Sequence, residues 1–153
     1  MNMSHISEPR QAEFVDYCIQ AKELGQKLGI EIRTSAANHR RLVVSFCGAM
    51  SIPSFTVTTK GIVTTCERDS EGVDYSYGKF SYELGDFVLN ERRIEDNRVL
   101  LEMPQKCHDC FCKWHCVGDC PDVRNINYDR CYVNRRLIQY ELESILNKEE
   151  TRG

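Results

Sequence analysis

Nine cysteines are the residues of this 153-residue chain whose type and spacing point to chemistry. Five of them fall between Cys107 and Cys120, in pairs only a few residues apart. Neighbouring thiols at such short spacing suit a shared metal better than a mutual disulfide, and the cysteine count is odd. Thiolate sulfur is a preferred ligand of zinc and of iron–sulfur clusters. The sequence therefore predicts a metal site held by cysteines.

The spacing has two parts. In the first part, Cys47 is followed by thirteen residues, then Gly61, four residues and Cys66. Two Thr- and Val-rich runs, 55–59 and 62–66, flank Lys60-Gly61, which predicts a β-hairpin with glycine at a turn position of positive φ. The ends of such a hairpin can bring two remote thiolates to one site. The second part reads C-x2-C-x5-C-x3-C, then ten residues and a last cysteine, and consists of Cys107, Cys110, Cys116, Cys120 and Cys131.

This arrangement over residues 41–135 resembles the SPASM domain, the C-terminal extension of radical S-adenosylmethionine (SAM) enzymes that modify peptides and proteins. All seven cysteines and the glycine of the family pattern are present. The resemblance implies two [4Fe–4S] clusters with interleaved ligands. It assigns Cys47, Cys66 and Cys120 to the first cluster, and Cys107, Cys110, Cys116 and Cys131 to the second.

The fourth ligand of the first cluster stays open in this reading. No cysteine lies between Cys47 and Cys66, so that iron is either open or closed by Cys112 or by a side chain other than cysteine. A structural zinc site is the alternative to iron and sulfide, because C-x2-C pairs and four thiolates also suit zinc.

The radical SAM signature C-x3-C-x2-C is missing. Cys112-x3-Cys116 is the nearest start, but Asp119 stands at the third position. We therefore expect a chain that does not cleave SAM and is not catalytic alone. The resemblance implies an electron-relay or substrate-positioning role, with a peptide or protein substrate and a separate radical SAM barrel as partners. The alternatives are an inactive gene fragment, or a metal-stapled peptide-recognition scaffold that presents Phe55, Tyr75, Tyr77 and Phe80.

The elements around the cysteines predict an α+β fold: a small hairpin with irregular cysteine-rich loops and helices. Residues 9–28 predict an amphipathic helix ended by Gly29, and residues 30–33 a short strand, similar to the end of a partial α/β barrel. We also expect a surface loop at 67–79 and helices at 96–103 and 132–147. The expected organisation is a lead-in at 1–40, the cluster domain at 41–135, and a C-terminal helix with a frayed tail at 136–153.

Charge and hydropathy exclude two classes of partner. The formal net charge of −3 gives no reason to expect nucleic acid or an anionic membrane surface. The apolar runs are too short to cross a bilayer, and the first residues lack the apolar core of a signal peptide. We therefore expect a cytoplasmic protein.

Overall fold

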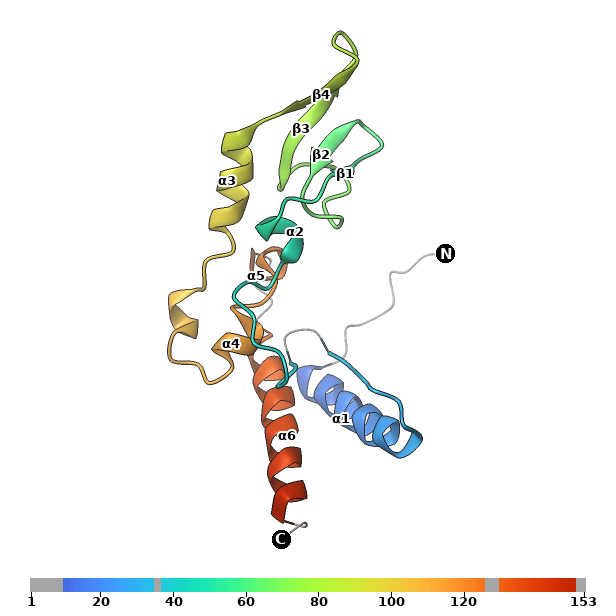
Figure 1. Cartoon of the computed structure of the whole chain (residues 1–153), viewed down its shortest axis with the longest axis vertical. Coiled ribbons are helices and arrows are strands. Elements are labelled where there is room, and N and C mark those ends of the chain that lie inside the picture. Colours follow the sequence, from blue (N-terminus) through green and yellow to red (C-terminus); the bar gives the residue numbers. More distant parts are fainter. Residues whose placement is uncertain (1–9, 35–36, 126–129, 151–153) are drawn as a thin grey trace. The chain divides into compact units, whose positions relative to one another are not determined.

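The computed structural model of the chain describes residues 10–34, 37–125 and 130–150 (Figure 1). It is mixed α+β and divides into two compact units. Unit 1 combines the chain up to Val44 with the chain from Lys106 onward, and unit 2 is Ser45–Gln105. These borders do not coincide with the expected segments 1–40, 41–135 and 136–153. Of the frayed tail expected at 148–153, residues 148–150 belong to the last helix of the structure, and residues 151–153 lie outside the described part of the chain.

Unit 1 contains two long helices, α1 (Gln11–Leu28) and α6 (Cys131–Glu150), which pack against each other (Figure 1). Both were expected from the sequence and are confirmed. Gly29 ends α1 in the left-handed region at φ 69°, a conformation that glycine adopts without steric cost. Two short helices lie between them along the chain, α4 (Lys113–Cys116) and α5 (Pro121–Asn125).

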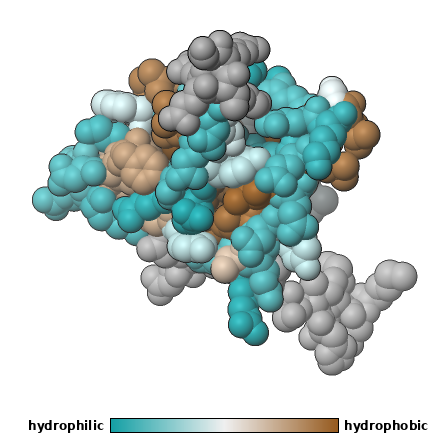
Figure 2. Space-filling view, turned by 90° about the horizontal axis from the view of Figure 1, so that it is seen from below, coloured by the Kyte–Doolittle hydropathy of each residue, from teal (hydrophilic) through white to brown (hydrophobic). Residues whose placement is uncertain are grey.

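The core of unit 1 is small and contains sulfur. Its buried members are Val15, Ala37, Cys112, Val133, Leu137 and Ile138. Four partly buried residues pack against them, namely Cys18, Ile19, Cys110 and Cys116. Several large apolar side chains of α1 remain exposed, among them Tyr17 and Leu28. Figure 2 shows hydrophobic side chains in separate patches among hydrophilic ones on the face that it displays.

The strand expected at 30–33 is wrong, because these residues have no regular structure. Their backbone groups find other partners. The Ile30 amide donates to the Gly25 carbonyl, as expected just beyond a helix end, and the Ile32 carbonyl accepts from Lys22 Nζ. A strand needs a neighbouring strand to satisfy its hydrogen bonds, and unit 1 has none among the described residues.

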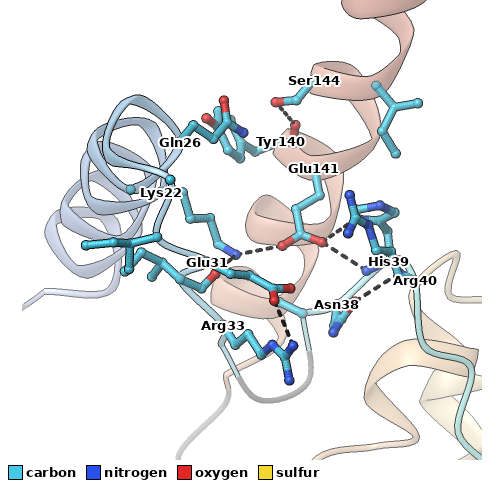
Figure 3. A pocket seen from close by; sticks show the side chains of 16 residues that line it. Lys22, Gln26, Glu31, Arg33, Asn38, His39, Arg40, Tyr140, Glu141 and Ser144 are labelled. Atoms are coloured by element: carbon cyan, nitrogen blue, oxygen red, sulfur yellow. Dashed lines mark hydrogen bonds and ion pairs between the residues drawn. The ribbon is translucent and has the colours of Figure 1, made fainter.

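A buried ion pair joins α1 to α6. Lys22 Nζ lies 2.6 Å from Glu141 Oε1, with both side chains almost fully buried. The other oxygen, Glu141 Oε2, accepts from the His39 amide at 2.9 Å and lies 2.6 Å from His39 Nδ1. Figure 3 shows Lys22 and His39 approaching this carboxylate from opposite sides. These residues line a cavity of about 400 Å³. The carboxylate thus holds α1, α6 and the segment at 37–40 together.

The pKa of Glu141 is set by opposing effects. Burial raises it, but the hydrogen bonds from Lys22 and His39 together outweigh burial, so the pKa of Glu141 lies below its ordinary value. A carboxyl group whose pKa is depressed by folding adds stability above its unfolded-state pKa, near 4.3 for glutamate. That stability is lost as the pH falls through the lower pKa of the folded state.

We predict that Glu141→Gln lowers the free energy of unfolding at pH 7 by about 3 kcal/mol, because it leaves the Lys22 ammonium buried without a counter-ion. The difference from the wild type should be constant above pH 5 and shrink as the pH falls below about 4.3. Urea unfolding followed by circular dichroism at several pH values measures both effects. Glu143→Gln, an exposed change on the same helix, should shift stability by less than about 0.5 kcal/mol. Equal effects of the two variants would contradict this account.

Unit 2 is a four-stranded antiparallel sheet in the order β1-β2-β3-β4. The strands are β1 (Thr56–Val57), β2 (Ile62–Thr64), β3 (Ser76–Ser81) and β4 (Asp86–Leu89). The expected hairpin is β1–β2 and is confirmed, with Gly61 at φ 73° in its turn. The loop expected at 67–79 is wrong in its last part, because β3 begins at Ser76.

Two helices flank the sheet along the chain, α2 (Gly48–Ser51) and α3 (Glu91–Val99). The helix expected at 96–103 therefore starts five residues too late. Asn90 caps the N-terminus of α3, where its side chain accepts a hydrogen bond from the Arg93 amide. Among the described residues no helix is both long and apolar enough to cross a membrane.

The aromatic residues of unit 2 are divided between buried and surface positions. Tyr75 and Tyr77 are buried, and the Tyr77 hydroxyl donates to the Ser54 carbonyl. The expectation that these two tyrosines are presented to a peptide is therefore wrong. Phe55 is half exposed and stands edge-on to Phe87, which in turn contacts Phe80.

Two neighbouring buried threonines differ in their hydrogen bonds. The Thr64 hydroxyl donates to Asp69 Oδ2 at 3.2 Å and accepts from the Cys66 amide at 3.3 Å. The Thr65 hydroxyl, equally buried, has no partner among the described residues. A buried hydroxyl without a partner costs about 1–3 kcal/mol.

We predict that Thr65→Val raises the free energy of unfolding of the metal-free protein by about 1 kcal/mol, because valine has the same shape and no polar atom to desolvate. The matched change Thr64→Val should lower it by about 1–2 kcal/mol, since two hydrogen bonds are lost. Denaturant unfolding of both variants checks this pair. Destabilisation of similar size by both changes would show that the Thr65 hydroxyl has a partner after all.

Candidate metal centre

The seven framework cysteines are divided between the two units. Cys47 and Cys66 lie in unit 2, and the other five lie in unit 1. All nine cysteines of the chain are in the described part, and none is in a disulfide. Within that part, no group of three cysteine, histidine or carboxylate side chains is placed to hold a metal ion without rearrangement.

Three of the four sulfurs assigned to the second cluster interact electrostatically. Burial raises the pKa of Cys107, and the neighbouring Cys110 sulfur raises it further. Burial likewise raises the pKa of Cys116, with smaller contributions in the same direction from Asp119 and Cys107. Burial therefore favours the neutral thiol at Cys107 and Cys116 in the metal-free protein, and metal binding there must release the protons.

The Cys116 sulfur has two N–H donors. Asn134 Nδ2 lies 3.2 Å from Cys116 Sγ, and the backbone N–H of Gly118 also bonds to this sulfur. Both contacts favour the thiolate and oppose the effect of burial on the pKa of Cys116. Such donors are the partners that sulfur ligands of a cluster need.

The backbone after Cys116 is strained. Val117, Gly118 and Asp119 all lie in the left-handed region, at φ 48°, 80° and 68°. A β-branched valine at positive φ is a genuine outlier, and such strain costs about 1–3 kcal/mol and concentrates at functional sites. This turn connects two expected ligands, Cys116 and Cys120.

Asp119 holds the strained turn from within. Its Oδ2 accepts from Arg130 Nε at 2.9 Å and from Asn134 Nδ2 at 3.1 Å. Its Oδ1 accepts from the Cys120 amide at 2.7 Å. A carboxylate with both oxygens engaged and 6% of its residue surface exposed has a structural task. Asp119 thus fixes the backbone amide of Cys120 and the side-chain amide of Asn134, which contacts Cys116.

The fourth sulfur of the second set, Cys131, is the first residue of α6. The N-terminus of a long helix carries partial positive charge and favours a thiolate. One turn further along α6, the Arg135 guanidinium forms a hydrogen bond with Cys110. Cys131, Asn134 and Arg135 are spaced i, i+3, i+4 and so share one face of α6. Sequence reasoning missed Asn134 and Arg135, although this spacing from Cys131 was a signal that could have found them.

Cys112 is the most buried cysteine, with 1% of its surface exposed in the core of unit 1. Burial, followed by the neighbouring Cys110 sulfur, raises the pKa of Cys112 to about 12. These properties are typical of a thiol packed in an apolar core rather than of a cysteine that is poised to bind a metal.

The other side chains of this segment have separate roles. His115 Nδ1 lies 3.1 Å from the carbonyl oxygens of both Asn38 and Arg41. Because carbonyl oxygens only accept, the hydrogen on Nδ1 is the donor in these hydrogen bonds. Trp114 and Phe111 are about half exposed. In unit 2, Cys47 is the N-cap residue of α2, and Cys66 follows β2 with its amide bonded to Thr64.

The donor set of unit 1 fits an iron–sulfur cluster in its chemistry. All candidate ligands are thiols, three of them interact, and N–H groups from Asn134, Gly118 and Arg135 approach two of the sulfurs. Comparison with known protein families, curated proteins and solved structures finds no match to this chain. The likeness to the SPASM domain therefore rests on the cysteine and glycine spacing.

We predict that Cys112→Ala leaves the iron content of the reconstituted chain unchanged and lowers its stability by about 1–2 kcal/mol, the cost of a small cavity in the core. The matched change Cys116→Ala, four residues away, should remove the iron of one cluster, about four atoms per chain. Iron and sulfide analysis after anaerobic reconstitution checks both. Loss of iron from Cys112→Ala would make Cys112 a ligand.

Proposed function

We propose that this chain is an auxiliary iron–sulfur domain that binds two [4Fe–4S] clusters and works with a radical SAM enzyme on a peptide or protein substrate. Cys47, Cys66 and Cys120 would hold the first cluster, and Cys107, Cys110, Cys116 and Cys131 the second. The observation that carries the proposal is the spacing of these seven cysteines and Gly61. When bound, such clusters supply one-electron transfer at a potential set by their surroundings.

Unit 1 supports the proposal with the surroundings of its sulfurs. The apolar core behind Cys110 and Cys116 excludes water from one side of the expected second site. N–H groups of Asn134, Gly118 and Arg135 point at ligand sulfurs. A low dielectric and N–H donors are the means by which a protein sets a cluster potential.

The task of the chain in this proposal is electron relay or substrate positioning. No C-x3-C-x2-C motif is present, so SAM cleavage would belong to a separate barrel. The fourth position of the first cluster would be open or closed by a side chain other than Cys112, because Cys112 is packed into the core of unit 1.

The decisive experiment is anaerobic reconstitution of the whole chain with iron and sulfide. We expect about eight irons per chain, the number in two [4Fe–4S] clusters, and EPR signals of reduced clusters after dithionite. Tight binding of zinc with no uptake of iron would overturn the proposal and favour a structural zinc site. Competition between the two metals in one sample makes the comparison direct.

One observation favours a second candidate function, a metal-stapled peptide-binding scaffold. The surface of unit 2 carries a chain of edge-to-face aromatic rings made by Phe55, Phe87, Phe80 and Tyr82. Aromatic residues of this kind are enriched at recognition surfaces. If Phe55→Ala and Tyr82→Ala weakened peptide binding while removal of cluster iron did not, the scaffold function would replace electron relay.

A further inference from the structure

We infer that Asn134 is a positioning residue that holds the Cys116 sulfur by an N–H···S hydrogen bond and raises the reduction potential of the cluster bound there. The inference rests on the proposed function and deepens it. Asn134 is 98% buried on α6, and its Nδ2 lies 3.2 Å from Cys116 Sγ. A buried amide pays a desolvation cost that only such partners offset.

The orientation of the Asn134 amide is fixed by a second contact. Its Nδ2 also donates to Asp119 Oδ2 at 3.1 Å. A flipped amide would bring its oxygen against Asp119 Oδ2, which accepts a hydrogen bond from Arg130 and has no hydrogen to donate. Asp119 is itself held by Arg130 and by the Cys120 amide. One N–H of Asn134 is therefore committed to Asp119 and the other to Cys116.

The direction of the effect follows from charge. Reduction adds negative charge to the cluster and its thiolate ligands, so an N–H dipole that points at a ligand sulfur stabilises the reduced form more than the oxidised form. Hydrogen bonds to charged groups are roughly twice as strong as those between neutral groups, and burial keeps water from replacing the lost donor. Loss of the Asn134 donor should therefore make reduction harder by about tenfold in the ratio of reduced to oxidised cluster at a fixed potential.

The test is a reductive titration of the reconstituted chain, followed by EPR. In Asn134→Leu, which keeps the side-chain volume, one of the two reductive transitions should move to lower potential by about 59 mV, the equivalent of tenfold for a one-electron couple. The other transition should stay. Gln139→Leu is the matched control on the same helix, because its hydrogen bonds run only to the side chains of Arg136 and Glu143 among the described residues. It should move neither transition.

The outcomes separate this inference from the proposed function. If the wild-type chain takes up no iron, the proposed function fails. If the wild type loads with iron but Asn134→Leu titrates like it, or both transitions move together, only the role of Asn134 is overturned.

A loading defect is handled by a second variant. Asn134→Ser keeps one O–H donor, which cannot bond to both Cys116 and Asp119. The reduction potential of the affected cluster should therefore also lie below its value in the wild type. If both variants fail to hold iron while Gln139→Leu loads, Asn134 is a folding residue and the tuning role is overturned.

Discussion

The packing of α1 against α6 is the constraint on which unit 1 depends. The unit is assembled from both ends of the chain, so its helices meet only through side chains far apart in the sequence. Two kinds of contact hold them: a small apolar core around Leu137 and Ile138, and the buried pair of Lys22 with Glu141. The ion pair also gives the contact its register, because a buried charge tolerates only the geometry in which its partner is present.

Sulfur completes this core rather than merely bordering it. Cys112 is among its buried members, and Cys110 and Cys116 pack against it. The segment that carries these cysteines has only short helices of its own and a strained turn at Val117. Local propensity does not account for such a segment, since the strain at Val117 must be offset by contacts elsewhere. On the proposed function, metal binding would supply part of that offset, which links folding to cluster assembly.

The elements that the sequence predicted well are those with a local signal. Gly29 and Gly61 marked a helix end and a hairpin turn, and both adopt the positive φ for which glycine is suited. The long helices α1 and α6 were also predicted, because their apolar residues recur with helical periodicity. Strands β3 and β4 were missed because polar and glycine-rich residues surround them, and only pairing within the sheet and the burial of Tyr75 and Tyr77 reveal them. The segment at 30–33, with isoleucine at alternate positions, misled for the opposite reason: it has strand propensity, but the described part of unit 1 contains no strand for it to pair with.

In the candidate site, too, the features with a local sequence signal were predicted and those that depend on tertiary contacts were not. Spacing identifies which cysteines are candidates, because ligand geometry constrains the number of residues between them. The cysteine spacing alone does not show which groups approach the sulfurs, because those groups belong to no cysteine motif. Asn134 and Arg135 are marked only by their i+3 and i+4 spacing from Cys131. Asn134 reaches Cys116 only through the packing of α6, and Asp119 is recognisable as a hub only when its three hydrogen bonds are seen together.

The Asp119 network also bears on how the two expected clusters relate. The Asp119 carboxylate accepts hydrogen bonds from the Asn134 side chain, which contacts Cys116, and from the backbone amide of Cys120. In the proposed assignment Cys116 and Cys120 are ligands of different clusters. Because both oxygens of Asp119 are engaged, a shift at either cysteine must disturb contacts at the other. The turn between these two cysteines is short and buried, so it cannot absorb such a shift as a flexible loop would. On the proposed assignment, the interleaved ligands and the shared Asp119 carboxylate would both couple assembly of one cluster to assembly of the other.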